Sequence, residues 1–499
     1  CGGFDFYTFQ DNIEDQDPKF VDEANLNLAL RDDSPAYLIP GFKQIPFETI
    51  GPQESDSKLG GYAINPVWMA EAMKVFNAPK PKLELPTKHP DAQWFPEASF
   101  GLFLHWGIHS VDGIDPSWSM MKGCPWHGSS DPYKKYNQDQ SQYYGLAGKF
   151  NPTLYDPDKW MAAAKKAGFT YAVLTTKHHD GYALWPTSFG DFSTKRYMGG
   201  RDLLKPYVDA CRKHGLKVGF YFSPRDWHYP GYPQAMEYGA KFPLPPAEEN
   251  FENFKAFYAY TLGQLHELLT RYGRIDLLWF DGMGWSGVGD MRAEQTLAWV
   301  RSIQPDIVIN PRWSGFGDFA TTECTPGKPE NWKPGQWWEA CDIWPTGHWG
   351  YVPSERFKPL SWVLSRLANC RAWGGNFLCN VGPRPDGTMP DVFYDYCDDL
   401  SQWMAHSRDS VIGAGLAPGE DRSNVPITTR GDTWYLHVLP SHQGPVVLSE
   451  VPEPEVVLLM RTGRTLSYER QGDGLTIAID ADLRSDLDDV VVVRWAPGS

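Results

Sequence analysis

The sequence predicts an α/β protein: a (β/α)8-like TIM barrel followed by a C-terminal antiparallel β-sandwich. From about residue 100, short apolar runs alternate with amphipathic segments of helical period, as in repeated strand–helix units. Several of these runs are apolar at nearly every position, as expected for parallel strands buried on both faces. After about residue 413, short strands follow one another with turns between them and no helical segment, which favours a sandwich.

Three regions follow from this pattern. Residues 1–90 are rich in Asp, Asn, Pro and Lys with weak periodicity, so we expect an N-terminal extension that wraps or docks without a core of its own. Residues 91–412 are expected to form the barrel. Residues 413–499 are expected to form the sandwich.

Eight segments are expected to be the barrel strands. They are residues 100–106, 171–179, 217–223, 275–281, 307–310, 318–323, 337–343 and 377–383. Eight parallel strands suggest a closed barrel. An open doubly wound sheet is the alternative, and it is weakened because no GxGxxG motif follows the first strand.

Five segments between the strands are expected to be helices. They are residues 156–168, 202–215, 250–273, 291–304 and 360–375. The first begins at Asp156, and the first three end at a glycine, which are typical start and stop signals of a helix.

Composition excludes several classes of function. Lys and Arg total 46 against 62 Asp and Glu, a net charge of −16, which argues against binding nucleic acid or anionic membrane through bulk electrostatics. No run of about 18 apolar residues is present, so no spanning helix is expected. The 22 Trp, 24 Tyr and 26 Phe are unusually many, and aromatic faces stack on sugar rings as well as packing cores.

The eight cysteines show neither a disulfide framework nor a CxxC pair that would indicate zinc. Most lie in apolar stretches and are expected to be buried free thiols. Cys1 is different, because it stands before two glycines at the start of the sequence. One interpretation is a lipid anchor on a bacterial lipoprotein that is periplasmic, anchored in the outer membrane or secreted; the other is a boundary of no functional meaning.

Polar or aromatic side chains stand at the C-terminal ends of the expected strands, where the chemistry of a TIM barrel is located. In chain order they are His105, Trp106, His178, His179, Tyr221, Trp279, Asp281, Arg312, Glu323, Glu339 and Asn380. A barrel with a purely structural role would not need such groups on one rim, so an active site is expected there.

His178 and His179 raise the question of a metal site. Successive side chains on a strand point to opposite faces, so one pocket receives both rings only if the strand end bends or bulges. Neither this pair nor the cysteine spacing gives a convincing set of ligands, and no metal is expected.

Asp281 is the strongest catalytic candidate. A carboxylate directly after the apolar run IDLLWF is costly to place without partners. Acid/base chemistry on a glycosidic bond needs a second carboxyl group. Glu323 and Glu339, from the sixth and seventh strands, could each face Asp281 across a sugar.

At these residues the sequence resembles glycoside hydrolase family 29, the α-L-fucosidases. The resemblance is strong over roughly residues 94–412 and weak over the C-terminal region. Its motifs are WFPEASFGLFLHWGIHS (94–110), KWMAAAKKAGFTYAVLTTKHHDGYALWPTSFGDFS (159–193), GFYFSPRDWH (219–228), LLWFDG (277–282), INPRW (309–313), DFATTE (318–323) and NFLCNVGPRPDGTMP (376–390).

The resemblance implies a barrel followed by a β-sandwich, hydrolysis of terminal α-L-fucosyl bonds with retention of configuration, and no metal or organic cofactor. It assigns the nucleophile to Asp281 and the acid/base to Glu323, with Glu339 as second choice. The fucose-binding positions that it implies are His105, His178, His179, Tyr221, Trp279 and Arg312. Trp106 and Trp118 are expected to add apolar surface at the rim.

The sequence also departs from the family. In PSWSMM (116–121) Trp118 is kept, whereas Ser117 and Ser119 stand where many relatives have Glu and Tyr. The loop at 122–144 is longer than in relatives and rich in Trp, Tyr and Asp. These differences affect the expected contacts to the substrate rather than the type of reaction.

The expected function is therefore that of a retaining exo-α-L-fucosidase acting on fucosylated oligosaccharides or polysaccharides. One alternative in the same family is an α-L-galactosidase acting on an algal polysaccharide, because L-galactose differs from L-fucose by one hydroxyl on C6. The alternative from another class is a surface glycan-binding lipoprotein without catalysis. The oligomeric state does not follow from the sequence.

Overall fold

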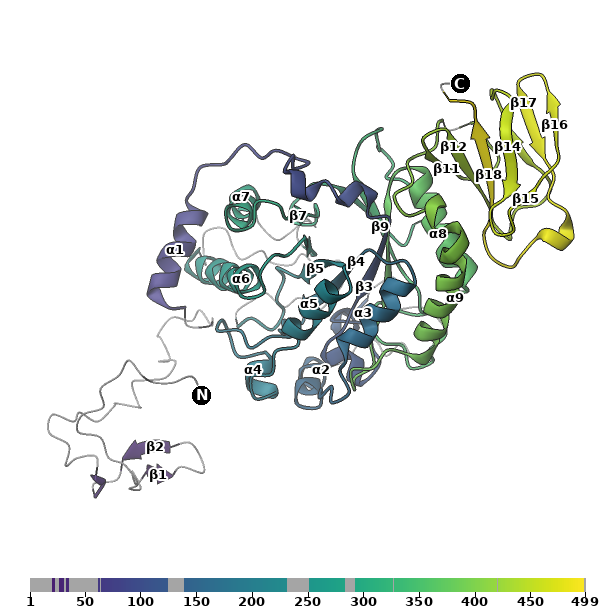
Figure 1. The fold of residues 1–499 in the computed structure, drawn as a ribbon. Helices are drawn as coiled ribbons and strands as arrows, with labels where there is room; N and C mark the ends of the chain where they lie inside the picture. The colour runs from purple at the N-terminus through teal and green to yellow at the C-terminus, as the bar shows by residue number, and fades with distance from the viewer. Residues whose placement is uncertain are drawn as a thin grey trace. The chain divides into compact units, whose positions relative to one another are not determined.

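A computed structural model shows an eight-stranded parallel sheet surrounded by helices, followed by two antiparallel sheets (Figure 1). It describes residues 20–22, 27–30, 33–35, 62 and 64–497, except 124–138, 231–250, 283–291, 326 and 420. The barrel strands are β3 (Phe100–Leu104), β4 (Tyr171–Lys177), β5 (Lys217–Phe222), β6 (Leu277–Phe280), β7 (Val308–Ile309), β8 (Ala320–Glu323), β9 (Trp338–Ile343) and β10 (Asn376–Val381). Each of the eight expected strands is present.

The strand order of this sheet is β7-β6-β5-β4-β3-β10-β9-β8, with all neighbours parallel. No ladder joins β7 to β8 in the described residues. Asp318 spans this seam instead, because its backbone N–H donates to the Ile309 carbonyl (2.7 Å) and its carboxylate accepts from the Ile309 N–H (2.7 Å). The expected barrel is thus closed by one side chain and one backbone bond where a regular barrel has a ladder.

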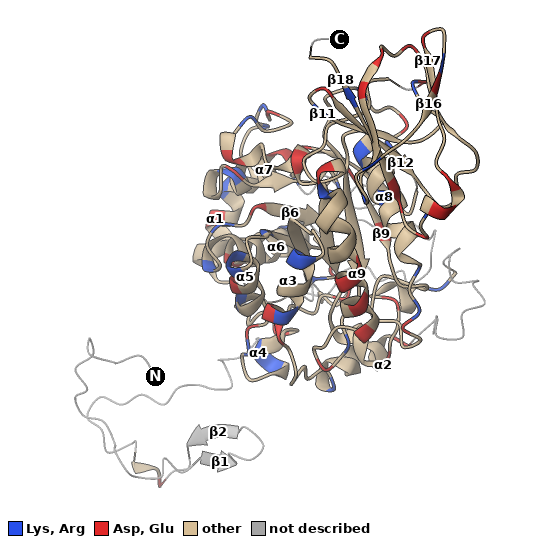
Figure 2. Cartoon of the chain, turned by 45° about the vertical axis from the view of Figure 1, so that its right-hand side comes forward, with Lys and Arg blue, Asp and Glu red and all other residues tan. Residues whose placement is uncertain are grey.

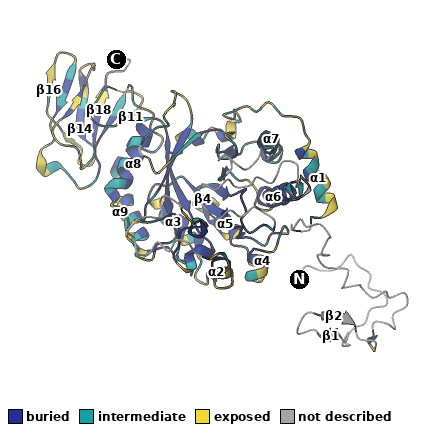
Figure 3. Ribbon diagram, turned by 180° about the vertical axis from the view of Figure 1, so that it is seen from behind, coloured by how far each residue is buried: buried dark blue, intermediate teal, exposed yellow. Residues whose placement is uncertain are grey.

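The five expected helices are α3 (Pro157–Lys166), α5 (Leu204–Lys213), α6 (Phe251–Arg271), α7 (Ala293–Ile303) and α8 (Leu360–Ala372). Asp156 caps α3 by accepting from the Lys159 N–H, as its position predicts. Residues 310–319, between β7 and β8, are all described and contain no helix, so the barrel departs from strict alternation. Strand β3 is buried at every position, and exposed residues lie on the outer helices (Figure 3).

Helices α1 and α9 were not predicted, and neither were the short helices α2 (Gln140–Gly145) and α4 (Thr194–Tyr197). Helix α9 (Asp391–Ser407) follows the last barrel strand and packs against α3. Helix α1 (Pro66–Phe76) packs against α6 and α7, with the Phe76 ring against Tyr258. Residues 64–76, which were expected to belong to the N-terminal extension, therefore lie on the barrel because α1 buries Ala72 and Phe76 there.

The C-terminal region consists of two antiparallel sheets around a shared apolar core. One has the order β11-β12-β18-β14-β15 and the other β13-β17-β16. The strands are β11 (Ile427–Arg430), β12 (Thr433–Val438), β13 (Val446–Leu448), β14 (Pro454–Leu459), β15 (Arg464–Thr465), β16 (Tyr468–Gln471), β17 (Gly474–Ile477) and β18 (Asp489–Trp495). The core takes residues from both sheets, including Leu436, Leu448 and Val491, which is the layering expected for a sandwich.

Residues 1–63 form a separate unit by compactness, of which the structure describes a short antiparallel pair, β1 (Phe20–Asp22) and β2 (Asn27–Leu30). Cys1 and most of the loop at 122–144 lie outside the described residues, so the lipid anchor and the role of that loop stay predictions. Within the described chain, no helix combines the length and apolarity that crossing a bilayer requires. Acidic and basic residues are interspersed along the outer helices (Figure 2).

Candidate active site

Asp281 lies directly after β6, at the C-terminal end of the barrel strands, and holds three hydrogen bonds from its surroundings. Oδ1 accepts from Arg312 Nη1 (3.1 Å) and from the Gly282 N–H (2.9 Å). Oδ2 accepts from the Tyr221 hydroxyl (3.0 Å). Burial by itself raises the pKa of this carboxyl, but the Arg312 charge, His179 and the hydrogen bonds outweigh burial and hold the pKa below its ordinary value. Asp281 is therefore an ionised carboxylate at neutral pH.

Gly282 makes this arrangement sterically possible. Its φ is +87°, and a Cβ there would lie 2.9 Å from His179 Cε1 and 2.8 Å from Arg225 Cδ. A larger residue would push either side chain out of the pocket, so the Asp-Gly pair after β6 lets the carboxylate approach the ring of His179.

Glu323 ends β8 and is joined to Asp281 through one guanidinium. Arg312 Nη2 lies 2.6 Å from Glu323 Oε2, while Nη1 of the same side chain lies 3.1 Å from Asp281 Oδ1. The Glu323 side chain is 41% exposed and that of Asp281 21%, so both face the open end of the barrel. Because a guanidinium group spans only a short distance, the two carboxylates that contact it lie close together.

Trp279 supports this arrangement from below. Its indole stacks on the Tyr221 ring (5.6 Å, 18°), and the Arg312 guanidinium lies over it at 4.7 Å. The two side chains that donate hydrogen bonds to Asp281, those of Arg312 and Tyr221, therefore both pack on the Trp279 indole. Phe103 packs edge-on against the same indole at 5.0 Å.

Glu339 does not lie at the rim where the sequence analysis placed it. It stands near the start of β9, opposite Asn376 at the start of β10, and is fully buried. The Tyr171 hydroxyl donates to Oε2 (2.5 Å) and the Trp279 indole N–H to Oε1 (2.9 Å). Burial raises the pKa of Glu339 to about 7 despite these bonds. The position of Glu339 along β9 is the physical reason: it is the second residue of the strand, and four more strand residues follow it, the last of which is Ile343.

His178 and His179 both reach the pocket because the end of β4 is irregular. The register of β4 on β5 shifts between Thr175 and Lys177, a β-bulge, and the chain turns immediately afterwards. The two rings lie 4.2 Å apart between centroids. The bulge thus provides the bend that the sequence analysis required for both rings to enter one pocket.

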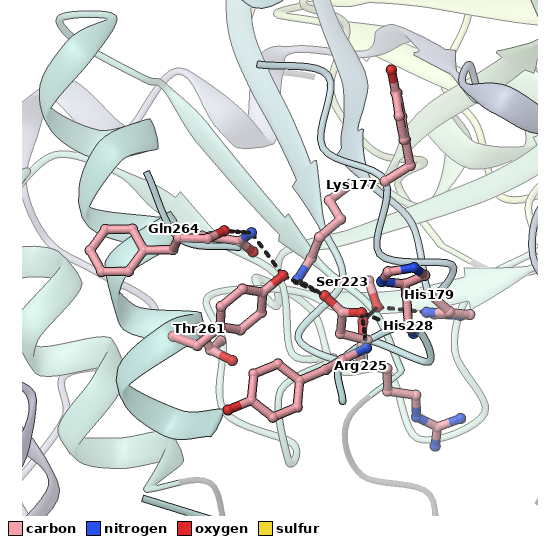
Figure 4. Close-up of polar contacts among 12 residues, drawn as sticks. Lys177, His179, Ser223, Arg225, His228, Thr261 and Gln264 are labelled. Carbon is pink, nitrogen blue, oxygen red and sulfur yellow. Dashed lines mark hydrogen bonds and ion pairs between the residues drawn. The ribbon is translucent and has the colours of Figure 1, made fainter. Parts of the chain in front are cut away.

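A buried ion pair stabilises the bulge at the end of β4. Lys177 Nζ lies 3.1 Å from Asp226 Oδ2, with both side chains almost fully buried. Asp226 also accepts from the Tyr260 hydroxyl (2.7 Å) on α6 and from the backbone N–H groups of His228 and Tyr229. Figure 4 shows Lys177 reaching this point, with Gln264 on one side of it and Ser223 and His179 on the other. The pair ties the ends of β4 and β5 to α6.

Each site histidine is held through its Nδ1. His105 Nδ1 lies 2.6 Å from Asn380 Oδ1, His178 Nδ1 2.6 Å from Ser117 Oγ, and His179 Nδ1 2.6 Å from Ser223 Oγ. Burial lowers the pKa of His105 to about 4 and of His179 to about 3, and holds that of His178 well below its usual value. All three rings are therefore neutral at pH 7.

The two expected tryptophans of the rim lie in different places. Trp106 is not part of the pocket: it is buried against Phe150 and Trp160, and its indole donates to the Arg384 carbonyl (3.0 Å). Its neighbour His105 takes the inward position, because adjacent side chains on a strand alternate. Trp118 does lie beside the site, edge-on to the His179 ring at 5.5 Å.

Ser117, which stands where many relatives have Glu, is buried beneath His178. Its backbone is strained, with φ +58°, and its Oγ accepts from the Asp180 N–H (2.8 Å). Asp180 in turn accepts from the Tyr143 hydroxyl (2.7 Å), and burial raises the pKa of Asp180 to about 6. Ser117 therefore supports a histidine from below. Ser119 is also buried.

Trp349 and Ser223 belong to the site and were missed. The Trp349 ring lies 5.1 Å from His105, and its carbonyl accepts from Asn380 Nδ2 (2.7 Å). Its only sequence signal is an aromatic residue in the HWG segment after the seventh strand. Ser223 follows β5 directly, where a small polar residue is too common to attract notice.

His178, His179 and Asp281 place one possible ligand atom each within 4.8 Å of one another, so a metal ion has to be considered. The Arg312 guanidinium already lies 3.1 Å from the Asp281 carboxylate, and its positive charge would repel a divalent cation there. Three such atoms beside an arginine suit hydroxyl groups of a neutral ligand better than a metal ion.

The arrangement can perform a double displacement. It holds an ionised carboxylate, a second and more exposed carboxyl group close to it, and neutral imidazole nitrogens around them. Two carboxyl groups at short separation are the device by which glycosidases retain configuration. Trp349 and Trp118 lie beside these groups and supply flat apolar surface, as a sugar ring requires, whereas Trp279 is buried beneath them.

Comparison with known proteins also indicates an enzyme that cleaves glycosidic bonds. The family model for α-L-fucosidase matches residues 69–409. Tissue α-L-fucosidase of Bos taurus is 29% identical over 369 residues, covering 69% of this chain and 74% of the relative. The structure of α-L-fucosidase isoenzyme 1 from Paenibacillus thiaminolyticus is similar with a TM-score of 0.67 and 31% identity, covering 81% of this chain and 98% of that one. The α-fucosidase of Thermotoga maritima, solved in complex with a mechanism-based inhibitor, has a TM-score of 0.62 and 26% identity, with 81% and 96% covered.

Proposed function

The chain belongs to the α-L-fucosidase family, glycoside hydrolase family 29, and from this premise we propose that it is a retaining exo-α-L-fucosidase with Asp281 as nucleophile and Glu323 as acid/base. The observation that carries the proposal is the Arg312 bridge, which joins Oδ1 of Asp281 and Oε2 of Glu323 at 3.1 and 2.6 Å. A retaining pair needs about 5–5.5 Å between its carboxyl groups, whereas inversion needs about 6.5–9.5 Å to admit a water.

In the first step, an oxygen of the Asp281 carboxylate attacks the anomeric carbon, and the bond to the leaving oxygen breaks. Glu323 gives its proton to that oxygen. Arg312 and the Tyr221 hydroxyl keep Asp281 ionised until the attack. The product of this step is an ester between the sugar and Asp281.

In the second step, Glu323 removes a proton from a water molecule, which attacks the same carbon. The ester bond breaks, Asp281 is released as a carboxylate, and the sugar leaves with its original configuration. The greater exposure of Glu323 suits this task, because the residue must meet both the leaving group and the incoming water.

Glu339 is a support for the site in this proposal. Both of its oxygens accept hydrogen bonds from barrel side chains, and no part of it is exposed. It holds Trp279, on which Arg312 and Tyr221 rest. The acid/base role therefore goes to Glu323.

The proposed substrate is a glycan that ends in α-L-fucose. Matched aryl α-L-fucoside and α-L-galactoside test this choice through their kcat/KM values. We expect the fucoside to be preferred by about 100-fold or less, since a pocket shaped for a methyl group rejects an added hydroxyl only weakly. A preference for the galactoside would favour the algal-polysaccharide alternative, and binding of both without turnover would favour a non-catalytic lipoprotein.

A further inference from the structure

Arg312 lies between two carboxyl groups that, in the proposed reaction, carry negative charge in turn. Before the first step Asp281 is ionised, while Glu323 holds the proton that it gives to the leaving oxygen. In the sugar ester Asp281 is neutral, and Glu323 is the carboxylate that takes a proton from water. The guanidinium contacts both groups, at 3.1 and 2.6 Å. Its main electrostatic attraction therefore changes direction twice in each turnover.

Two neutral side chains contact the same guanidinium. Arg312 Nε donates to Thr321 Oγ1 (3.4 Å), and Arg312 Nη2 lies 4.0 Å from Cys341 Sγ. These contacts are weaker than those with the carboxylates, but they do not depend on which carboxyl group is ionised. Because Thr321 and Cys341 contact two different nitrogens, together they oppose rotation of the planar group.

The directions of the hydrogen bonds show what each group offers. Arg312 Nε–H can only donate, so the Thr321 hydroxyl oxygen is the acceptor. Cys341 Sγ lies 3.5 Å from the Thr322 carbonyl, which can only accept, so the thiol proton points there and leaves the sulfur lone pairs for Arg312. Burial raises the pKa of the Cys341 thiol well above its ordinary value, so the sulfur stays uncharged throughout the reaction.

The register of β8 and β9 places these groups side by side. Thr321 stands opposite Glu339, and Glu323 stands opposite Cys341. Alternate residues of a strand share a face, and Glu339 is fully buried inside the barrel, so all four side chains point inward. Thr322 lies between Thr321 and Glu323 in the sequence and points to the other face, where its Oγ1 has no hydrogen-bond partner within the described residues.

We propose that Thr321 and Cys341 are positioning residues for this reaction, because they hold the Arg312 guanidinium in place while the negative charge passes from one catalytic carboxyl group to the other. This inference rests on the proposed function. In the free enzyme the contact with Glu323 is the shorter of the two, so a guanidinium released from Thr321 should turn toward Glu323 and away from Asp281. The nucleophile would then lose part of the charge that keeps it ionised.

The pH dependence of kcat/KM tests the role of Thr321. Burial raises the pKa of Asp281, and the Arg312 charge and the neighbouring groups bring it below its ordinary value; only ionised Asp281 can attack. Thr321→Val keeps the shape of the side chain and removes its oxygen. With a dinitrophenyl fucoside it should lower kcat/KM about tenfold at the pH optimum and move the acidic limb to higher pH by about 0.5 unit or more. An acidic limb at the wild-type position would overturn the proposal for Thr321.

Two further variants separate positioning from packing. Thr321→Ser keeps the hydroxyl, so it should retain the wild-type acidic limb and about a third or more of the wild-type kcat/KM. Thr322→Val removes a buried hydroxyl on the other face of the same strand, and it should leave the pH profile unchanged. If Thr321→Ser loses as much activity as Thr321→Val, or if Thr322→Val moves the acidic limb by the same amount, the contact of the Thr321 hydroxyl with Arg312 is not what positions the site.

Burst kinetics with the same substrate tests Cys341 in the second step, when Glu323 is the charged partner. Cys341→Ala removes the sulfur and should slow the release of the sugar from Asp281 about two- to fivefold. Cys341→Ser keeps a donor for the Thr322 carbonyl and an acceptor for Arg312, so its second step should be faster than that of Cys341→Ala. The reverse order of these two rates, or a second step in Cys341→Ala that is as fast as in the wild type, would refute the role of Cys341.

A failure of the proposed function gives a different result. If the wild-type protein does not hydrolyse aryl fucosides at any pH, the proposed function is wrong, and the positioning role fails with it. If the wild-type protein hydrolyses them and Thr321→Val shares its pH profile and its kcat/KM, only the positioning role is wrong.

Discussion

At the scale of single residues, Arg312 determines how the site works. It contacts both proposed catalytic carboxyl groups, and its guanidinium lies over the face of the Trp279 indole. The neighbouring negative charges raise the pKa of Arg312 further above its ordinary value, so its charge is constant at every working pH. In the proposed mechanism Asp281 can therefore form and release its bond to the sugar, and Glu323 can give and take a proton, while the cation between them stays in place.

Replacing Glu323 and replacing Glu339 by alanine should have different effects on kcat/KM. Glu323→Ala should lower kcat/KM by about 10²–10⁴-fold for a fucoside with a poor leaving group and far less for a dinitrophenyl fucoside, because only the former needs full protonation. Glu339→Ala should weaken both substrates to a similar extent, because Trp279 loses its anchor. Steady-state kinetics on the two substrates checks this. Exchanged profiles would make Glu339 the acid and refute the assignment.

The raised pKa of Glu339 should also change how the free energy of unfolding depends on pH. Its pKa is about 7 in the folded protein against an ordinary value of 4.5, so the folded state favours the protonated form. Its contribution is therefore fully present below about pH 4.5 and lost as the pH rises through 7. Glu339→Gln, which cannot ionise, should gain about 3 kcal/mol relative to wild type between pH 4.5 and pH 8.

Urea unfolding of both proteins across this range measures the difference. If the difference between their free energies of unfolding stays constant across this range, Glu339 has the same pKa in the folded and unfolded states, which would contradict the account.

At the scale of elements, the turn after β4 decides which side chains enter the pocket. The strand itself could be predicted from YAVLTTK, because four consecutive apolar residues are followed by two β-branched threonines. The bulge could not, because it lies where Lys177 meets Asp226, in the loop after the next strand, and Asp226 in turn binds Tyr260 from α6. Contacts between segments far apart in the sequence leave no local pattern.

Gly181 in this turn offers a direct test. Its φ is +84°, and a Cβ would lie 2.2 Å from Asp226 Oδ1. Gly181→Ala should lower the free energy of unfolding by about 1–3 kcal/mol more than Gly200→Ala, and only Gly181→Ala should reduce kcat/KM, by tenfold or more. Gly200 is the matched control, because its φ is +83° and no atom lies within 4 Å of the added carbon. Equal effects of the two changes would show that the close contact with Asp226 is unimportant.

Features that depend on how distant segments pack also explain the other differences between the sequence predictions and the structure. The rim position of Glu339 was inferred from its strand, but the depth of a residue along a strand depends on where the strand starts and ends in the barrel. Trp106 was expected in the pocket because it is aromatic and follows His105; alternation along the strand sends it outward, into Trp160. Asp281, Arg312 and the three histidines could be predicted, because each ends or follows a clear apolar strand.

At the scale of the whole molecule, the barrel and the C-terminal sheets are joined by buried polar contacts. The Trp403 indole on α9 donates to the Asp488 carbonyl (2.8 Å), and the Asp488 carboxylate lies 2.6 Å from His437 Nδ1. His437 Nε2 contacts Thr428 Oγ1 (3.0 Å), which donates to the Ser410 carbonyl. Residues 64–499 accordingly form one compact unit.

This junction should make the two parts unfold together. Asp488→Ala leaves His437 buried without its partner and should cost about 3–5 kcal/mol. Urea midpoints read from fucoside turnover, which reports on the barrel, and from tryptophan fluorescence should fall together. Asp486→Ala, at an exposed neighbouring position, should change neither midpoint. Turnover that persists while fluorescence shifts would show that the barrel is stable on its own.

The central claim is that Asp281 forms a covalent bond to the sugar. Incubation with 2-deoxy-2-fluoro-α-L-fucosyl fluoride slows the second step more than the first, so the ester should accumulate. Peptide mapping by mass spectrometry should then locate one fluorofucosyl group on Asp281, and Asp281→Asn should take up none. A label on Glu323 or Glu339, or hydrolysis of aryl fucosides by Asp281→Asn at the wild-type rate, would contradict the account.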